Sequence, residues 1–294
     1  MSLIRSGRIR LLSWNICFGG IGASRTEYDP AASRENLHGI VRAIIGKSPD
    51  AIVLQEYRDA EETGGVIKAG LREAGYTCHC SNPGLDKNGI LIALGKSLTD
   101  TYTVSPAASF KVDTLRLDEI YRYRWVNLGL ESQGMSFELL GLHIPDVRPG
   151  RKGGPETFVR SIGHKQVIWD ALIEYAREKL KAGSEAIIAG DFNTGLNAED
   201  QSQNTDSYYL SDRMAYLKRL KNSHGDGLTD AWRKFHPEPG PADYTWFLGN
   251  RGFRLDYTFL TPGLGERLSG VEYSHEERIS GLSDHSMVLA DICL

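Results

Sequence analysis

The sequence predicts a layered α/β protein in which helices cover β-sheets. Short apolar runs bounded by turn residues recur along the whole chain, and helix-like stretches lie between several of them. No internal repeat, low-complexity tract or Pro/Gly/Ser linker separates two different halves. With 294 residues, of which 40% are hydrophobic, the chain can bury one sizeable core. We therefore expect a single domain over residues 1–294.

The predicted elements follow from local apolar patterns. Strands are expected at the short apolar runs Ile9–Trp14, Ala51–Leu54, Gly89–Leu94, Arg124–Leu130, Phe137–His143, Ala186–Ala189, Leu255–Leu260 and Met287–Ile292. Helices are expected where apolar residues fall near helical spacing, at Ser33–Lys47, Gly64–Ala74, Ser161–Lys181 and Ser211–Lys221. The last of these opens with a Ser/Asp start signal. The glycine-rich stretches Gly19–Ala23 and Pro149–Pro155 follow strands and are expected to be loops.

Charge and cysteine content exclude several classes of protein. The net charge of −4 gives no general attraction to nucleic acid or anionic membrane, although a local basic patch could exist. Scattered cysteines do not suit a disulfide framework, and Cys78-His79-Cys80 is too tightly spaced for the usual zinc turn; the cysteines are Cys17, Cys78, Cys80 and Cys293. The chain has neither a signal-peptide pattern nor an apolar run approaching the roughly 20 residues that span a bilayer. We expect a monomeric cytoplasmic protein without a membrane partner.

Polar residues stand where several apolar runs end. Asn15, Glu56, His143, Asp191 and Asn193 all occupy such positions. Any one of them is more often a turn former, a helix cap or a structural residue, but five such residues in one chain are harder to attribute to turns. Ligands of layered α/β proteins gather at strand ends. Carboxylates, amides and histidines there can hold a hard cation and a phosphate.

Two segments near the C-terminus add to this set. Ser283-Asp284-His285 comes just before the last predicted strand and joins a metal-competent carboxylate to a side chain that exchanges protons near neutral pH. Asp256 lies in an apolar strand, where an unpaired charge is costly and a partner is expected. A histidine is the natural partner for this carboxylate.

Six short motifs occur in a fixed order along nearly the whole chain. They are Ser13-Trp14-Asn15-Ile16, Leu54-Gln55-Glu56, Gly141-Leu142-His143, Gly190-Asp191-Phe192-Asn193, Arg254-Leu255-Asp256-Tyr257 and Ser283-Asp284-His285. This order resembles the motif set of the endonuclease/exonuclease/phosphatase superfamily. The resemblance implies a four-layer α/β/β/α sandwich of two packed mixed β-sheets flanked by helices.

The resemblance also implies a metal site. Glu56 would be the main metal carboxylate, with Asn15 and Asp284 near the metal or its waters. Mg²⁺ fits such hard oxygen ligands, and Mn²⁺ could substitute for it.

The same resemblance implies the catalytic roles. Asp191 would position or deprotonate the attacking water, and Asn193 would orient both that carboxylate and the phosphate. His285, held by Asp256, would stabilise the pentacovalent phosphate or exchange a proton. His143 would contact a non-bridging phosphate oxygen. The sequence leaves the identity of the general base open.

The motifs give mixed indications of the substrate. The segments 243–247 and 252–256 resemble the exonuclease III and abasic-site endonuclease branch, in which aromatics matching Trp246 and Phe253 line a pocket for a flipped sugar. Leu255 would complete that pocket, although all three side chains could instead pack the core. His143 departs from that branch and resembles deoxyribonuclease I, sphingomyelinases and the tyrosyl-DNA phosphodiesterase group. Segment 196–209 is acidic and polar, which also puts abasic-site specificity in doubt.

One basic cluster is a candidate for binding substrate phosphates. It comprises Arg148, Arg151 and Lys152 in the loop beside His143, together with Arg122 and Arg124. Such a run is usually only solvated, but its place beside a predicted phosphate ligand favours binding.

The leading hypothesis is a divalent-metal-dependent phosphodiester hydrolase that acts on DNA as an endonuclease, exonuclease or end-processing enzyme. The alternative is a phosphatase or phospholipase-type hydrolase for inositol phosphates or sphingomyelin-like phosphodiesters. A non-catalytic binding protein with this fold is disfavoured, because every predicted catalytic position carries a competent residue.

Overall fold

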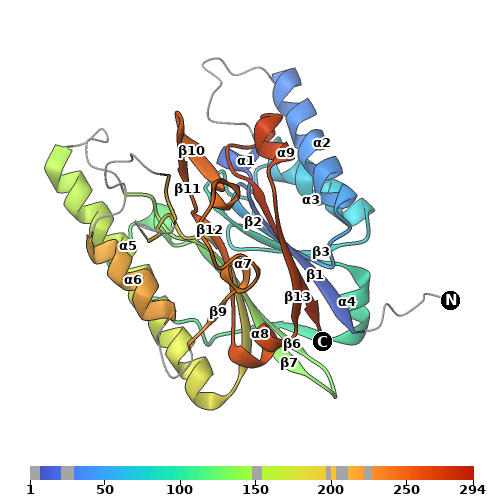
Figure 1. The fold of residues 1–294 in the computed structure, drawn as a ribbon. Helices are drawn as coiled ribbons and strands as arrows, with labels where there is room; N and C mark the ends of the chain where they lie inside the picture. Colours follow the sequence, from blue (N-terminus) through green and yellow to red (C-terminus); the bar gives the residue numbers. More distant parts are fainter. Residues whose placement is uncertain (1–6, 21–29, 148–153, 197–199, 203–210, 222–226) are drawn as a thin grey trace.

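The computed structural model describes residues 7–20, 30–147, 154–196, 200–202, 211–221 and 227–294. Among these residues, the main strands form two six-stranded mixed sheets with helices on the outer faces (Figure 1). The layered α/β class and the sandwich implied by the family resemblance are therefore confirmed.

The first sheet joins the N-terminal third of the chain to its C-terminal end. In it β1 and β2 run parallel, and every other neighbouring pair is antiparallel. The strand order is β13 (Leu268–Ser274), β14 (Met287–Cys293), β1 (Arg8–Asn15), β2 (Ala51–Tyr57), β4 (Gly89–Leu94) and β3 (Thr77–Cys80).

The second sheet is built from the middle of the chain. Its only parallel pair among the described strands is β7 and β8. The strand order is β5 (Thr103–Pro106), β6 (Trp125–Glu131), β7 (Ser136–His143), β8 (Glu185–Asp191), β12 (Asp256–Leu260) and β9 (Thr229–Asp230). A separate hairpin pairs β10 (Trp246–Leu248) with β11 (Arg251–Phe253).

The helices cover the two outer faces of the sandwich (Figure 1). Helices α2 (Pro30–Gly46) and α3 (Gly64–Glu73) lie on the first sheet, whereas α5 (Gly154–Ala182) and α6 (Ser211–Lys221) lie on the second. Shorter helical segments connect the strands: α1 (Cys17–Gly20), α4 (Lys96–Thr101), α7 (Ala231–Phe235), α8 (Pro262–Glu266), α9 (Glu276–Ile279) and the 3₁₀ turns Thr114–Arg116, Glu119–Tyr121 and Pro241–Asp243. No helix among the described residues is both long and apolar enough to cross a membrane.

Apolar side chains of the central strands are buried on both faces. In β2, Ala51 and Val53 face the core between the sheets, whereas Ile52 and Leu54 face the helices. Side chains alternate along a strand, so a run buried on both faces must be apolar throughout. This is why the continuous apolar runs were recognisable in the sequence.

Two glycine-rich segments differ from the expected loops. Gly154 and Pro155 form the start of α5, where proline is tolerated because the first helical turn needs no N–H partner. Gly19 and Gly20 belong to the short turn α1. The remaining positions of both expected loops, 21–23 and 149–153, lie outside the described residues.

The two sheets approach each other closely near the end of β7. A Cβ atom added at Gly141 would lie 2.6 Å from Cγ1 of Val53 in the opposing sheet. Val53 is fully buried on β2, three residues before Glu56. The absence of a side chain at Gly141 therefore lets the strand ends that carry His143 and Glu56 come together.

We expect Gly141→Ala to destabilise the protein by about 1–3 kcal/mol, the usual cost of overpacking a core. The matched control is Gly129→Ala in the neighbouring strand, where the added Cβ would meet Ser105 at an ordinary 3.6 Å. Urea unfolding of the two variants measures the difference. Equal stabilities would contradict the proposed role of close sheet packing.

Candidate active site at the strand ends

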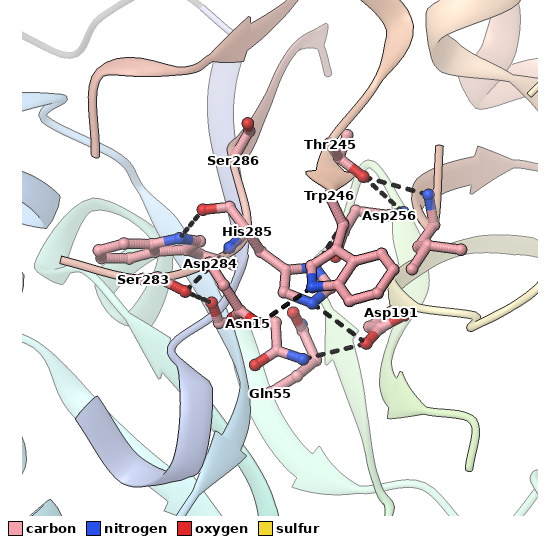
Figure 2. Close-up of polar contacts among 12 residues, drawn as sticks. Asn15, Gln55, Asp191, Thr245, Trp246, Asp256, Ser283, Asp284, His285 and Ser286 are labelled. Carbon is pink, nitrogen blue, oxygen red and sulfur yellow. Dashed lines mark hydrogen bonds and ion pairs between the residues drawn. The ribbon is translucent and has the colours of Figure 1, made fainter. Parts of the chain in front are cut away.

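The predicted polar residues converge at one end of the sandwich. In the second sheet, Asp191 pairs with His143 on one side and with Asp256 on the other. In the first sheet, Asn15 ends β1 beside β2, which carries Glu56. Figure 2 shows residues of both sheets pointing toward one another around Asp191 and His285.

Both carboxylate oxygens of Asp191 accept hydrogen bonds from neighbouring residues. Its Oδ2 accepts hydrogen bonds from Asn15 Nδ2 at 3.0 Å and from Asn193 Nδ2 at 2.9 Å. Its Oδ1 accepts from the Asn193 backbone N–H at 2.8 Å. Burial raises the pKa of Asp191 to about 7, with Asp256 adding to the increase and His285 opposing it. A carboxylate near neutral pKa is suited to proton transfer.

Asn193 is fixed in the orientation that serves Asp191. Its backbone is left-handed, with φ 45°, a conformation that asparagine tolerates better than most residues. Its Nδ2 also donates to the Ile144 carbonyl at 3.0 Å and lies 3.2 Å from His143 Nε2. The Asn193 carbonyl accepts from the buried Lys165 Nζ at 2.6 Å. Lys165 was not predicted, because a lysine on a helix looks like a surface residue in the sequence.

His285 and Asp256 form the buried pair that the sequence predicted. His285 Nδ1 lies 2.8 Å from Asp256 Oδ2, and His285 Nε2 lies 4.0 Å from Asp191 Oδ2. Burial acts to lower the pKa of His285, but the Asp256 carboxylate outweighs it and raises that pKa to about 10. His285 is therefore a cation at neutral pH and faces Asp191 on its other side.

His143 remains neutral. Burial holds its pKa well below the ordinary value, and the nearby cations Arg124, His285 and Lys165 lower it further. Arg124 donates a hydrogen bond to His143 Nδ1. Burial also lowers the pKa of Arg124, while the charges of Glu56 and Asp191 oppose that effect. The structure thus places Arg124 within the predicted site.

Glu56 stands at an irregularity of β2. The pairing of β2 with β4 shifts register between Gln55 and Tyr57, and Glu56 itself has a φ of 57°. Such a bulge redirects a side chain out of the sheet pattern. Glu56 Oε1 lies 3.5 Å from Asn15 Nδ2, and Oε2 accepts from the Phe18 backbone N–H at 2.8 Å.

Asp284 borders the site beside the predicted sugar pocket. Its Oδ2 accepts from Trp246 Nε1 at 3.0 Å, and Cys17 also hydrogen-bonds this carboxylate. Although burial acts to raise the pKa of Asp284, the His285 cation and these hydrogen bonds hold it below its ordinary value. Asp284 is therefore ionised at neutral pH.

The predicted sugar pocket consists of closely packed side chains. Trp246 is 7% exposed, whereas Phe253 and Leu255 are each 1% exposed. The three side chains form one apolar cluster. The Trp246 ring centroid lies 6.3 Å from that of His285. Trp246 therefore packs beside His285, and the role of the cluster in holding a sugar stays a prediction.

A buried ionic network holds the segment before Asp256. Arg254 is 1% exposed and donates to Asp200 Oδ1 at 3.1 Å and to Tyr273 Oη at 2.9 Å, and it also pairs with Asp230. Tyr273 in turn donates to the Asp256 backbone carbonyl at 3.1 Å. This network fixes the start of β12, and therefore the position of the Asp256 side chain. The functional importance of these residues could not be read from the sequence, because each belongs to a different element.

The basic cluster is only partly described. Arg124 is in the site, and Arg122 is exposed. Arg148, Arg151 and Lys152 lie outside the described residues, so their predicted contacts with phosphate stay predictions.

The donor set fits a hard divalent cation. The Glu56 side chain is 17% exposed, and a hydrated Mg²⁺ needs only one or two such carboxylates. Around Asp191 the described carboxyl groups outnumber the cationic side chains: Glu56, Asp191, Asp256 and Asp284 against His285, Arg124 and Lys165. Asp191, Asp256 and His285 also offer ligand atoms within 4.8 Å of one another. However, Asp256 and His285 are already hydrogen-bonded to each other, which makes this trio a poorer metal site. Glu56 and Asp284 are thus the better candidates.

Comparison with known proteins agrees with the fold described above. A family model described as the Endonuclease/Exonuclease/phosphatase family matches residues 12–285. No curated protein matches the sequence.

Several solved structures are similar over nearly the whole chain. A Neisseria 3′ phosphatase bound to a product DNA hairpin is 20% identical, with a TM-score of 0.68, covering 97% of this chain and 99% of that one. An AP endonuclease from Archaeoglobus fulgidus is 18% identical, with a TM-score of 0.68 and coverage of 97% and 100%. An AP endonuclease from Leishmania major is 14% identical, with a TM-score of 0.71 and coverage of 98% and 88%. At these identities the similarity establishes the fold.

We expect His285 in the metal-free protein to remain protonated well above neutral pH, because Asp256 raises its pKa to about 10. Asp256→Asn removes the charge that opposes burial, so the pKa of His285 should fall by several units toward or below its ordinary value of about 6.5. Nuclear magnetic resonance of the histidine ring measures both values. A His285 that titrates near pH 6.5 in the wild type would contradict the buried pair.

Proposed function

Because the chain belongs to the endonuclease/exonuclease/phosphatase family, we propose that it is a Mg²⁺-dependent phosphodiester hydrolase whose substrate is DNA. Its action would be that of an endonuclease, an exonuclease or an end-processing enzyme. The observation that carries this proposal is the buried Asp191, held by two asparagines and facing the cationic His285. One of the similar solved structures is that of a Neisseria 3′ phosphatase bound to a product DNA hairpin.

We assign the attacking water to Asp191. A group with a pKa of about 7 can accept a proton at physiological pH, and the hydrogen bonds from Asn15 and Asn193 fix the orientation of its carboxylate. His285 would place its positive charge against the oxygens of the phosphoryl group, where negative charge grows in the transition state. Asp256 keeps His285 protonated and correctly turned.

Two further groups would bind the phosphate. Arg124 donates to the neutral His143, and His143 Nε2 lies 3.9 Å from Glu56 Oε1 and 3.6 Å from Asp191 Oδ2. An arginine guanidinium matches the geometry of phosphate oxygens, and a buried one loses less strength to solvent. Lys165 acts through Asn193, so it positions the site without contacting the substrate.

Glu56, with Asn15 and Asp284 near it, would hold the Mg²⁺, for which Mn²⁺ could substitute. When bound, the ion would supply Lewis-acid stabilisation of the phosphoryl oxygens. The Asn15 amide donates to both Glu56 and Asp191, and it therefore links the metal carboxylate to the carboxylate that handles water.

A substrate screen tests the assignment to DNA. It compares nicked, single-stranded and abasic duplex DNA with RNA, inositol phosphates, sphingomyelin and a generic phosphodiester, each with Mg²⁺ and with EDTA. We expect cleavage of at least one form of DNA that depends on Mg²⁺. Turnover of sphingomyelin or an inositol phosphate without cleavage of any DNA would favour the phospholipase or phosphatase alternative.

We expect Glu56→Gln and Asp191→Asn each to lower the rate by about 10²–10⁴-fold, for different reasons. Glu56→Gln should also raise the Mg²⁺ concentration needed for half-maximal activity. Asp191→Asn should lower kcat and change that Mg²⁺ concentration much less. Titration of activity with Mg²⁺ separates the two. Glu73→Gln, an exposed carboxylate on α3, is the matched control. Full activity in EDTA or in either site variant would overturn the mechanism.

We expect Trp246→Ala to slow turnover of a nucleotide substrate more than that of a small generic phosphodiester if the cluster holds a sugar. Stacking on an aromatic is worth on the order of 1–3 kcal/mol, which sets the scale of the difference. Phe259→Ala, in the core on the far side of the second sheet, is the control for loss of a buried ring. Equal losses on both substrates would mean that Trp246 only packs against Asp284 and His285.

A further inference from the structure

The turn that follows β1 has an unusual backbone. Four successive residues, Cys17, Phe18, Gly19 and Gly20, have positive φ values of 50°, 50°, 74° and 84°. Each of the two residues with a side chain is disfavoured in this conformation, and bulky residues adopt it rarely. Strain of this kind persists only where neighbouring groups fix it, and it occurs often at functional sites.

Residues of the active site hold this turn in place. The Cys17 backbone N–H donates to Asn15 Oδ1 at 3.0 Å, and the Phe18 N–H donates to Glu56 Oε2 at 2.8 Å. At the far end, Asn36 Nδ2 donates to the Gly20 carbonyl at 2.6 Å. The direction of the Phe18 side chain is therefore tied to the two residues expected at the metal.

The Phe18 ring is presented to solvent beside these carboxylate and amide groups. It is 40% exposed, in contrast to the closed cluster of Trp246 and its neighbours. The Arg58 guanidinium lies 5.5 Å from the Phe18 ring centroid. Arg58 is held by a 2.7 Å hydrogen bond from its Nε to Asn88 Oδ1, and Gly19 lets its stem lie across the turn.

This pair combines the two groups that bind single nucleotides in nucleic-acid sites. An aromatic face stacks with any base, and a neighbouring cation contacts the sugar-phosphate backbone. Phe18 keeps its strained backbone although its ring is 40% exposed, so burial of the ring alone does not account for this turn. A single ring with an arginine is also too small and too polar for a lipid-binding patch.

We propose that Phe18 and Arg58 form a nucleotide subsite next to the scissile phosphate, in which a base stacks on Phe18 and Arg58 contacts an adjoining phosphate. This inference deepens the proposed function and rests on it. The subsite would recognise bases without reading their sequence, because every base has a stacking face. Cleavage would then be faster beside an ordinary nucleotide than beside a position that lacks its base.

The test compares two small ligands that differ only in the base. Calorimetry measures the dissociation constants of thymidine 3′,5′-bisphosphate and of 2-deoxyribose 3,5-bisphosphate for the wild type and for Phe18→Leu. The wild type should bind the thymidine ligand more tightly by about 5- to 150-fold, the range expected for one base stacked on an aromatic ring. Phe18→Leu should abolish most of that preference, and Phe18→Tyr should keep it.

Two further variants complete the comparison. Arg58→Gln should weaken both ligands, because both carry phosphates. Phe235→Leu removes a ring of similar exposure, 41%, on α7 and should change neither constant. The melting temperature of each variant checks that the fold is kept.

Several results would overturn the subsite. A wild type without preference for the thymidine ligand would exclude base stacking, and an equal weakening of both ligands in Phe18→Leu would reduce Phe18 to a support for Glu56. Binding of phosphatidylcholine vesicles by the wild type, lost in Phe18→Leu, would assign the ring to a membrane surface. DNA cleavage is measured separately: equal cleavage beside an ordinary nucleotide and beside an abasic position overturns only the subsite, whereas failure to cleave any DNA overturns the proposed function as well.

Discussion

The burial of one carboxylate, that of Asp191, is the constraint on which the site depends. Removing a carboxylate from water costs several kcal/mol unless hydrogen bonds and opposite charges compensate. Here Asn15 and Asn193 supply the hydrogen bonds, and His285 supplies the charge. The compensation is incomplete, so the pKa of Asp191 stays near 7. The residual cost of burial thus gives this carboxyl the proton affinity that its proposed role in hydrolysis needs.

The second sheet and the first sheet contribute different parts of this arrangement. Pairing within the second sheet sets Asp191 between His143 and Asp256, so the separation of these groups is fixed by strand spacing. Asn15 and Glu56 come from the first sheet, and their distance from Asp191 depends on how closely the two sheets pack. Packing in the core therefore controls the geometry of groups at its edge. The rigid strands confer an accuracy that loops alone would not provide.

The sequence predicted the inner strands better than the outer ones, for a physical reason. The central strands are buried on both faces and read as continuous apolar runs. The strands β3, β5 and β13, which lie at sheet edges, were not predicted because much of their surface is exposed. Their residues pair with a neighbour through the backbone, which leaves little trace in side-chain pattern. Lys165 was missed for the converse reason, since its burial arises only from the packing of α5 against the turn of Asn193.

The sequence by itself determined which chemical groups stand at strand ends, and the ordered motifs were sufficient to predict the sandwich and the pairing of Asp256 with His285. Only the tertiary structure decided how these groups face one another: that Arg124 contacts His143, that Trp246 is closed over by its neighbours, and that Phe18 projects beside Glu56. Local sequence encodes strand and turn through short-range sterics and periodic burial. Contacts between residues distant in the chain, and the pKa values that depend on them, arise only when the two sheets pack together.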